Sequence, residues 1–403
     1  MTNPNPTWWP PAFIALTIVG AVALRFTRKW RGYQFTAWII VAVVSAMIYP
    51  ARFLHAGGVD LRQPWLVLTV VQLVMFGMGT QMSWRDFAGV LQSPRAVLVG
   101  VLGRFTVMPL TGFALIKLFH FEPAIAAGVI LIGSCSSGLA SNVMAYLAKS
   151  NLALSVTVTA VTTVVAVVMT PLWMKLLAGT MVQVDWFRMM VEIIKIVLVP
   201  VGAALLHDYL KTASSKGRRA VWWMAAGGAL AIFGLAGGGH PLGTGTAINL
   251  VCYLLGAVIF GALYHLVSQR FPRLDERIPV LSMLGIVYFT AVTTAAGRDH
   301  LLHVGALLFV VAVLHNTLGY TLGYWLGRAA GLDRNSARSL AFETGIQNGG
   351  MASGIAGATG QLATMGLAAA IFSPWMNVSG SILANYWQKR PAAVKVPHRP
   401  QEI

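Results

Sequence analysis

Long apolar runs recur along nearly the whole chain and are separated by short polar loops. A helical run of about 17 to 25 apolar residues crosses the roughly 30 Å hydrocarbon core of a bilayer. Because the bilayer core holds no water to satisfy exposed backbone groups, a chain with many such runs folds as a bundle of membrane helices. A transmembrane β-barrel needs alternating segments of about ten residues instead. The pattern therefore predicts an all-α polytopic membrane protein.

The charge content agrees with this class. Only 10% of the residues are charged, whereas a soluble domain has roughly 25%. The formal net charge of +17 does not indicate nucleic-acid binding, because Lys and Arg lie in short loops rather than along one arm or face. Cys135 and Cys252 both fall inside apolar runs, which indicates packing rather than a disulfide framework or a metal site.

Hydropathy predicts roughly thirteen membrane helices. They lie near 9–24, 35–50, 65–82, 96–119, 124–147, 152–178, 187–207, 220–237, 247–268, 279–296, 302–328, 339–358 and 362–387. Lys and Arg gather in alternate loops, which face the cytoplasm in helical membrane proteins. The first run follows a segment without positive charge, so it predicts an uncleaved helix rather than a signal peptide. An odd number of spans places the N-terminus outside the inner membrane and the C-terminus in the cytoplasm.

Two segments, 133–142 and 343–354, are too polar and too rich in small residues to be plain membrane helices. They contain the related tetrapeptides GLAS and GMAS, and another apolar helix follows each of them. We expect both segments to be broken within the membrane. A matched pair of interrupted segments in two halves of a chain is typical of an inverted-repeat transporter with its site at the bilayer midplane.

Five helices for each repeat give a ten-helix inverted-repeat core with two broken helices, plus about three extra helices. The predicted divisions are an extra N-terminal helix and basic loop (1–34), a first five-helix repeat (35–178), the start of the second repeat (179–217), an inserted helix pair (218–277), the rest of the second repeat (278–388) and a cytoplasmic tail (389–403).

Glu343 is one of very few carboxylates deep inside an apolar segment. A charge at that depth costs about 2.5 to 3.5 kcal/mol or more unless it is compensated. The nearby polar candidates are Thr344, Gln347 and Asn348 in the same segment, Ser141 and Asn142 in the other broken segment, and Ser155 and Thr159 on one face of the next helix. One carboxylate with several neutral oxygens suits a hard cation such as sodium. Ser155 and Thr159 alone would indicate only helix packing.

Other polar residues inside the apolar runs have less specific interpretations. Glu192 and Lys195 stand three apart on one helix, so they are predicted to form a structural pair. Arg104 cannot discharge, so it must face a carboxylate, a cavity or an anionic substrate. His315 and Asn316 also lie inside a helix, and the histidine is interpreted as a packing residue. The chain has no phosphate loop, nucleophile triad or cluster of metal-ligand spacing, so an enzyme is not predicted.

Two stretches carry a resemblance to a known family. GLASNVMAYLAKSNLALSVTVTAVTT followed by MTPL, and FETGIQNGGMASGIA followed by FSPWMNVSGSILANYW, resemble the bile acid:sodium symporter family over roughly 35–210 and 278–388. The resemblance implies a panel domain and a core domain, built from two inverted five-helix repeats, with the broken helices crossing in the core. It also implies two sodium sites.

The resemblance assigns residues to each of these sites. The first sodium would be held by Ser141, Asn142, Ser155, Thr159 and Glu343. The second would be held by Glu343, the carbonyls of Thr344 and Ile346, Gln347, and a glutamine on an earlier helix, at whose position this chain has Arg104. We therefore hypothesise that Arg104 substitutes for the second ion. The residues predicted to line the substrate crevice are Leu139, Asn348, Met376 and Asn377, of which Leu139 and Met376 replace more polar residues.

The resulting prediction is a secondary active transporter that couples symport of a small organic anion, a carboxylate or sulfonate, to sodium by alternating access. Membrane lipid and the anion are its expected partners. The residues leave two alternatives open. One is a sodium-independent or proton-coupled carrier that uses Glu343, and the other is a non-transporting membrane receptor of the same fold.

Overall fold

The computed structural model describes residues 9–26, 34–237 and 246–390, which form helices apart from one short β-hairpin. Seven continuous helices within these ranges are long and apolar enough to cross a membrane. The predicted all-α polytopic class is therefore confirmed. Each of the predicted helical segments contains a helix, whereas the total number of membrane crossings stays a prediction because several helices are short or broken.

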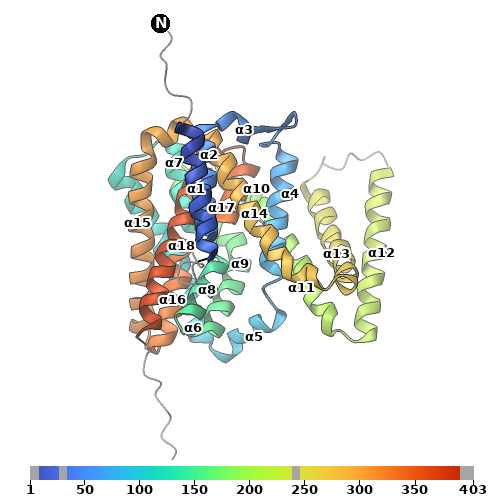
Figure 1. Ribbon diagram of the computed structural model, residues 1–403. Coiled ribbons are helices and arrows are strands. Elements are labelled where there is room, and N and C mark those ends of the chain that lie inside the picture. The colour runs from blue at the N-terminus through green and yellow to red at the C-terminus, as the bar shows by residue number, and fades with distance from the viewer. Residues whose placement is uncertain (1–8, 27–33, 238–245, 391–403) are drawn as a thin grey trace, which may run out of the picture.

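The helices and strands follow in chain order (Figure 1). They are α1 (Trp9–Phe26), α2 (Gln34–Ile48), α3 (Pro50–Leu54), β1 (His55–Ala56), β2 (Val59–Asp60), α4 (Pro64–Gly79), α5 (Trp84–Gln92), α6 (Pro94–Phe119), α7 (Pro123–Ser134), α8 (Leu139–Leu147), α9 (Leu152–Trp173), η2 (Met174–Ala178), α10 (Trp186–Ile193), η3 (Ile194–Leu198), α11 (Val199–Thr212), α12 (Ser215–Gly237), α13 (Thr246–Arg270), α14 (Arg273–Ala296), α15 (Arg298–Ala329), α16 (Arg334–Gly345), α17 (Gly349–Ala358) and α18 (Gly366–Gln388).

The π-helical turns η2 and η3 interrupt two long spans beside proline. Pro171 precedes η2 by three positions, and Pro200 follows η3 by two. Proline removes a backbone donor and clashes with the preceding turn, so the chain widens at η3, just before Pro200, instead of continuing as an α-helix. The residues of η2 and η3 therefore remain part of continuous spans, as the predicted ranges 152–178 and 187–207 required.

The helices pack as two groups. The core group consists of α6 to α9 and α15 to α18, and the panel group consists of α2, α4, α11 and α14. The two groups touch where α17 packs on α4 and where α18 packs on α14. This arrangement is compatible with the core and panel that the resemblance implied, but the division of the chain into repeats stays a prediction.

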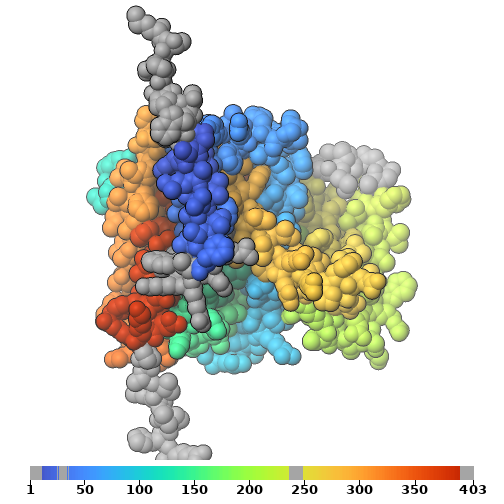
Figure 2. Space-filling view, in the orientation of Figure 1, coloured from blue at the N-terminus to red at the C-terminus, as the bar shows by residue number. Residues whose placement is uncertain are grey.

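Three helices lie at the edges of these groups. α1 packs along α2 on the outside of the bundle (Figures 1 and 2). α12 and α13 form a hairpin beside α11, at the right of Figure 1. The predicted extra helices therefore exist as helices. Most of the predicted basic loop after α1 and of the tail 389–403 lies outside the described residues.

The hairpin is fastened to the panel group by close packing and by polar contacts. A Cβ atom added to Gly261 of α13 would lie 2.6 Å from the carbonyl oxygen of Ala203 in α11. The Tyr264 hydroxyl donates to Asp275 Oδ1 of α14 at 2.8 Å, and the rings of His265 and His207 are joined by a 3.3 Å hydrogen bond. The attachment thus depends on a glycine surface and on a buried polar network.

Replacing Gly261 with Val should lower the stability of the protein by about 1–3 kcal/mol, because the new side chain would meet backbone that cannot move aside. Thermal unfolding in detergent measures the effect. Gly227→Val on the neighbouring helix α12 is the matched control, because a Cβ atom there meets nothing within 4 Å. Equal unfolding temperatures for the two variants would contradict the close contact.

Candidate functional site

The two broken helices cross at their breaks. α7 ends at Ser134 and α8 begins at Leu139, while α16 ends at Gly345 and α17 begins at Gly349. The residues between them pair as an isolated antiparallel bridge of Ser137 with Gln347. The bridge has two backbone hydrogen bonds, from Gly138 N to Ile346 O at 3.3 Å and from Asn348 N to Ser136 O at 3.0 Å.

Gly138 is required at this crossing by the approach of the other chain segment. A Cβ atom at this position would lie 2.6 Å from the Gln347 carbonyl oxygen. Any larger residue would push the two breaks apart. The two segments that the sequence predicted to be broken therefore contact each other at their breaks.

Glu343 lies at the end of α16, fully buried, and three hydroxyl groups surround its carboxylate. Its Oε1 atom accepts from Ser141 Oγ at 2.6 Å and from Ser155 Oγ at 2.5 Å. Its Oε2 atom accepts from Thr159 Oγ1 at 2.8 Å. Asn142 Oδ1 lies 2.9 Å from Ser155 Oγ and 3.1 Å from Thr159 Oγ1. All five residues predicted for the first sodium site are thus brought together.

The cluster holds more acceptor oxygens than hydrogens. Each hydroxyl has one hydrogen to donate, yet each lies within hydrogen-bond distance of two acceptors. The pairs are Ser141 with Glu343 Oε1 and Gly138 O, Ser155 with Glu343 Oε1 and Asn142 Oδ1, and Thr159 with Glu343 Oε2 and Asn142 Oδ1. Some of these close oxygen pairs therefore have no proton between them. An all-oxygen set of this kind fits a hard cation.

Arg104 of α6 is fully buried beside the crossing. Its Nε and Nη2 atoms donate to Cys135 O at 2.9 and 2.6 Å, and Nη2 also donates to Ser136 O at 3.2 Å. Its Nη1 atom donates to Thr344 O at 2.7 Å. The guanidinium thus joins the C-terminal ends of α7 and α16, where helix dipoles favour a positive charge.

The residues predicted for the second sodium site are arranged differently from those of the first. Thr344 O already accepts from Arg104, and Ile346 O already accepts from Gly138 N. The Gln347 amide is buried, and within the described ranges neither its oxygen nor its nitrogen has a hydrogen-bond partner. The two backbone carbonyls predicted to bind the second sodium therefore already accept hydrogen bonds from other residues of the protein.

A cavity of about 570 Å³ lies between the core and panel groups, next to the crossing. All four residues predicted to line a substrate crevice line it: Leu139, Asn348, Met376 and Asn377. The other polar lining residues are Thr36, Gln81, Asn142, Tyr146, Ser282, Gln347, Ser373 and Ser381, and the methionines are Met75, Met78, Met144, Met283 and Met376. None of the described lining residues carries a formal charge.

Two residues of the site were not predicted. Asn316 of α15, which was noted only as lying inside a helix, donates from Nδ2 to Gly345 O at 2.5 Å and accepts a hydrogen bond from Ser379. Ser137 donates to the Glu343 carbonyl oxygen at 2.7 Å. The sequence did offer one signal for Asn316, an amide side chain inside an apolar run. It did not reveal that Asn316 lies next to the break after α16, because the two are on different helices. His315 does pack, with Nε2 2.9 Å from Met108 O.

Replacing Asn316 with Ala should destabilise the protein by about 1–3 kcal/mol, because the Gly345 carbonyl would lose its donor in a buried place. Unfolding temperature in detergent measures this loss. Asn385→Ala is the matched control, because Asn385 also donates to a backbone carbonyl, at 2.8 Å, but is exposed. A loss as small as that of the control would show that the Gly345 carbonyl does not need Asn316.

The fold and the crossing define a multi-pass, all-helical membrane protein with two interrupted helices. The chain belongs to the sodium bile acid symporter family. The model of that family, described as "Sodium Bile acid symporter family", matches residues 68–239. The chain is 30% identical over 368 residues to the protein described as an uncharacterized sodium-dependent transporter, YocS, of Bacillus subtilis, covering 91% of this chain and 94% of that one. The predicted family is therefore confirmed.

Two further comparisons agree. The chain is 30% identical over 289 residues to the ileal sodium/bile acid cotransporter of Homo sapiens, covering 70% of this chain and 66% of the human protein. The solved structure of a sodium proton antiporter of Methanocaldococcus jannaschii is similar with a TM-score of 0.52 and 11% sequence identity, over 95% of this chain and 98% of that one. The latter similarity concerns the fold alone.

Proposed function

We propose that the protein is a secondary transporter that couples the symport of a small organic anion, a carboxylate or sulfonate, to sodium. The observation that carries this proposal is the surplus of oxygens around Glu343. Sodium, when bound, would supply the positive charge that the buried carboxylate and the crowded hydroxyls lack. The names of the similar proteins, which describe sodium-dependent transport, support the same function.

The cavity beside the crossing supports an anionic substrate. α8 and α17 both begin at the crossing, and Leu139 and Gly349, their first residues, line the cavity. Helix N-termini present free backbone N–H groups and the positive end of the dipole, which favour an anion. Asn348 caps α17 through its own Oδ1 atom, which accepts from Met351 N at 3.0 Å. The methionines opposite would accommodate an apolar part of the substrate.

The extent of the cavity supports alternating access. It reaches Thr36 at the start of α2, Gln81 beyond α4, Tyr146 near the end of α8 and Pro279 near the start of α14. Under the predicted topology these helix ends face the cytoplasm, with the N-terminus outside the inner membrane. The described conformation is then open inward. Movement of the core group against the panel group would expose the same site outward.

We further propose that Arg104 takes the place of a second sodium. It supplies one permanent positive charge to the carbonyls that the two helix breaks release. A second cation would meet both this charge and carbonyls that are already bound. The carrier would then couple to one sodium ion.

The sodium site is tested by thermal stability in detergent with sodium against potassium. A ligand that binds only the folded protein stabilises it by RT ln(1 + [L]/Kd), about 2.7 kcal/mol at one hundred times Kd. Sodium should raise the unfolding temperature of the wild type and of Glu276→Gln, an exposed carboxylate on α14. Glu343→Ala should lose the effect. Equal stability of the wild type in both salts would favour a sodium-independent carrier instead.

The number of bound ions is tested by equilibrium binding of radioactive sodium to purified protein. The wild type should bind one ion, Glu343→Ala none, and Arg104→Gln, which removes the charge and restores an amide, two. Arg104→Lys, which keeps the charge, should not gain an ion. Two ions in the wild type would exclude the role proposed for Arg104, while leaving sodium coupling intact.

Transport itself is tested in liposomes with candidate carboxylates and sulfonates. Sodium-driven uptake of one of them would support the symporter. Binding of the same anion without any flux would instead support a non-transporting receptor of the same fold.

A further inference from the structure

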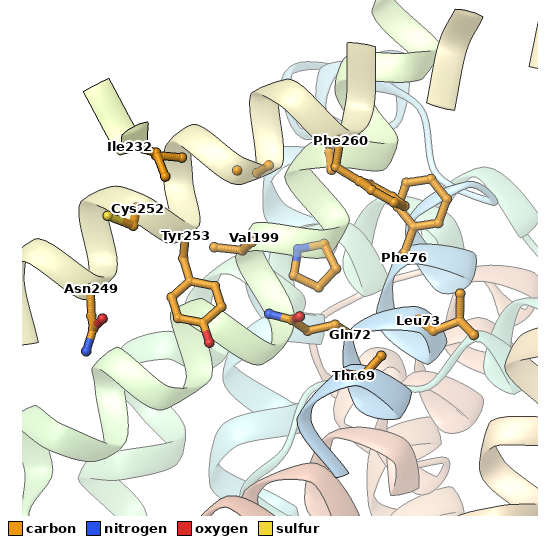
Figure 3. A pocket seen from close by; sticks show the side chains of 14 residues that line it. Thr69, Gln72, Leu73, Phe76, Val199, Ile232, Asn249, Cys252, Tyr253 and Phe260 are labelled. Carbon is orange, nitrogen blue, oxygen red and sulfur yellow. The ribbon is translucent and has the colours of Figure 1, made fainter. Parts of the chain in front are cut away.

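A second cavity, of about 550 Å³, lies away from the crossing, between the panel group and the α12–α13 hairpin (Figure 3). One wall is formed by α4 and α11, and the other by α13 with Ile232 of α12. Most of its lining is apolar or small: Leu73, Phe76, Val199, Pro200, Ala203, Ile232, Gly256, Ala257 and Phe260. We call this cavity the hairpin groove.

The hairpin groove exists because α13 packs closely on the panel group mainly in its C-terminal half, next to the loop that leads to α14. Gly261, Tyr264 and His265, which make the close contacts with α11 and α14, all lie in the C-terminal half of α13. In the N-terminal half, the Lys195 ammonium of η3 lies over the Tyr253 ring, 5.5 Å from its centroid, and Ala257, at the middle of α13, packs against the buried cluster around Phe76. The ribbons of α4 and α13 diverge away from the C-terminal end of α13 (Figure 1), and the cavity lies between these helices.

The end of the hairpin groove beside the N-terminal half of α13 is polar. The Tyr253 hydroxyl and the Gln72 amide are directed into the same space, and Asn249 lies one turn from Tyr253 along α13 (Figure 3). Gln72 uses its Nε2 atom on Lys195 O at 3.1 Å, which leaves its oxygen as an acceptor. Within the described part of the chain, the Tyr253 hydroxyl and the Asn249 amide have no hydrogen-bond partner.

These polar groups lie at one depth. Tyr253, Gln72 and Lys195 stand seven, eight and nine residues after the first residues of α13, α4 and α10. At 1.5 Å per residue this is about 10–14 Å below the helix ends. Lys195 Nζ pairs there with Glu192 Oε1 at 2.6 Å, and the two side chains remain 14% and 22% exposed. A paired charge at that depth, beside a cavity, is a feature of binding sites in membrane proteins.

We propose that the hairpin groove binds one phospholipid. An acyl chain would lie along Leu73, Phe76 and Phe260, and the polar part of the lipid would accept from Asn249, three residues after the start of α13, and from Tyr253 one turn deeper. The surroundings favour this occupant. The walls include α13 and the span that ends with α11, both long and apolar enough to cross the hydrocarbon core, where water is absent and acyl chains are abundant. A narrow wedge with an apolar interior and a polar end matches one amphipathic molecule better than the face of a second protein copy.

The hairpin groove can be filled without disturbing the helices. Gly256 lines the cavity, and a Cβ atom added there meets nothing within 4 Å. Gly256→Leu would therefore occupy the space of the acyl chain. Gly227→Leu is the matched control, because Gly227 also has open space at its Cβ position but lies on α12 away from the cavity.

The first test measures the lipid retained by the protein. Wild type, Gly256→Leu and Gly227→Leu are purified in mild detergent from the same membranes, and their masses are measured intact. The wild type and Gly227→Leu should each carry one phospholipid, and Gly256→Leu should carry at least tenfold less. Equal lipid in all three proteins, detergent alone, or a second protein copy in place of lipid would overturn the proposal.

The second test uses a thiol already present in the groove. Cys252 lines the cavity and is partly accessible, whereas Cys135 is fully buried, so maleimide should react at Cys252. Adding phosphatidylglycerol to delipidated wild type should slow this reaction several-fold, and Tyr253→Phe should need more lipid for the same protection. A reaction rate that phosphatidylglycerol does not change would contradict the proposed site. Neither test depends on transport activity.

Discussion

The hydrogen bonds from the Arg104 guanidinium to the carbonyls of Cys135, Ser136 and Thr344 are the contacts on which the centre of this protein depends. A membrane helix can break only where its released backbone groups find partners, because the hydrocarbon core supplies none. Arg104 satisfies both breaks from a third helix, and Asn316 does the same for Gly345 from a fourth. The broken ends can therefore stay buried, and the cavity, the exposed helix N-termini and the Glu343 cluster all follow from the breaks.

The Glu343 cluster connects elements that are far apart in the sequence. Its oxygens come from α8, α9 and α16, so a cation held there would draw these three elements together. Leu139 and Gly349 are the first residues of the helices whose N-termini line the cavity beside the crossing. Ordering the crossing would therefore improve the geometry offered to an anion, and by linkage the anion would strengthen cation binding to the same degree.

Hydropathy was sufficient to predict the helices, because each membrane span must satisfy its own backbone and carries a local apolar signal. It missed α3, α5 and the β-hairpin, which are short. The cluster around Glu343 was predictable because a buried carboxylate among hydroxyls is unusual in an apolar chain. The carbonyl partners of Arg104, the role of Asn316 and the hairpin groove were not predictable, since each depends on distances between helices that no local pattern encodes.

Arg104 and Glu343 both belong to the core group, whose helices pack directly on one another. Their charges are opposite, so when both are ionised the pair contributes no net charge. Moving one elementary charge through a potential of 100 mV involves about 2.3 kcal/mol. Because the two charges cancel, this pair would add nothing to that term if the core group moved across the membrane field, in either direction. Under the proposed symport, one sodium ion bound together with a monovalent anion would likewise add no net charge to the moving core.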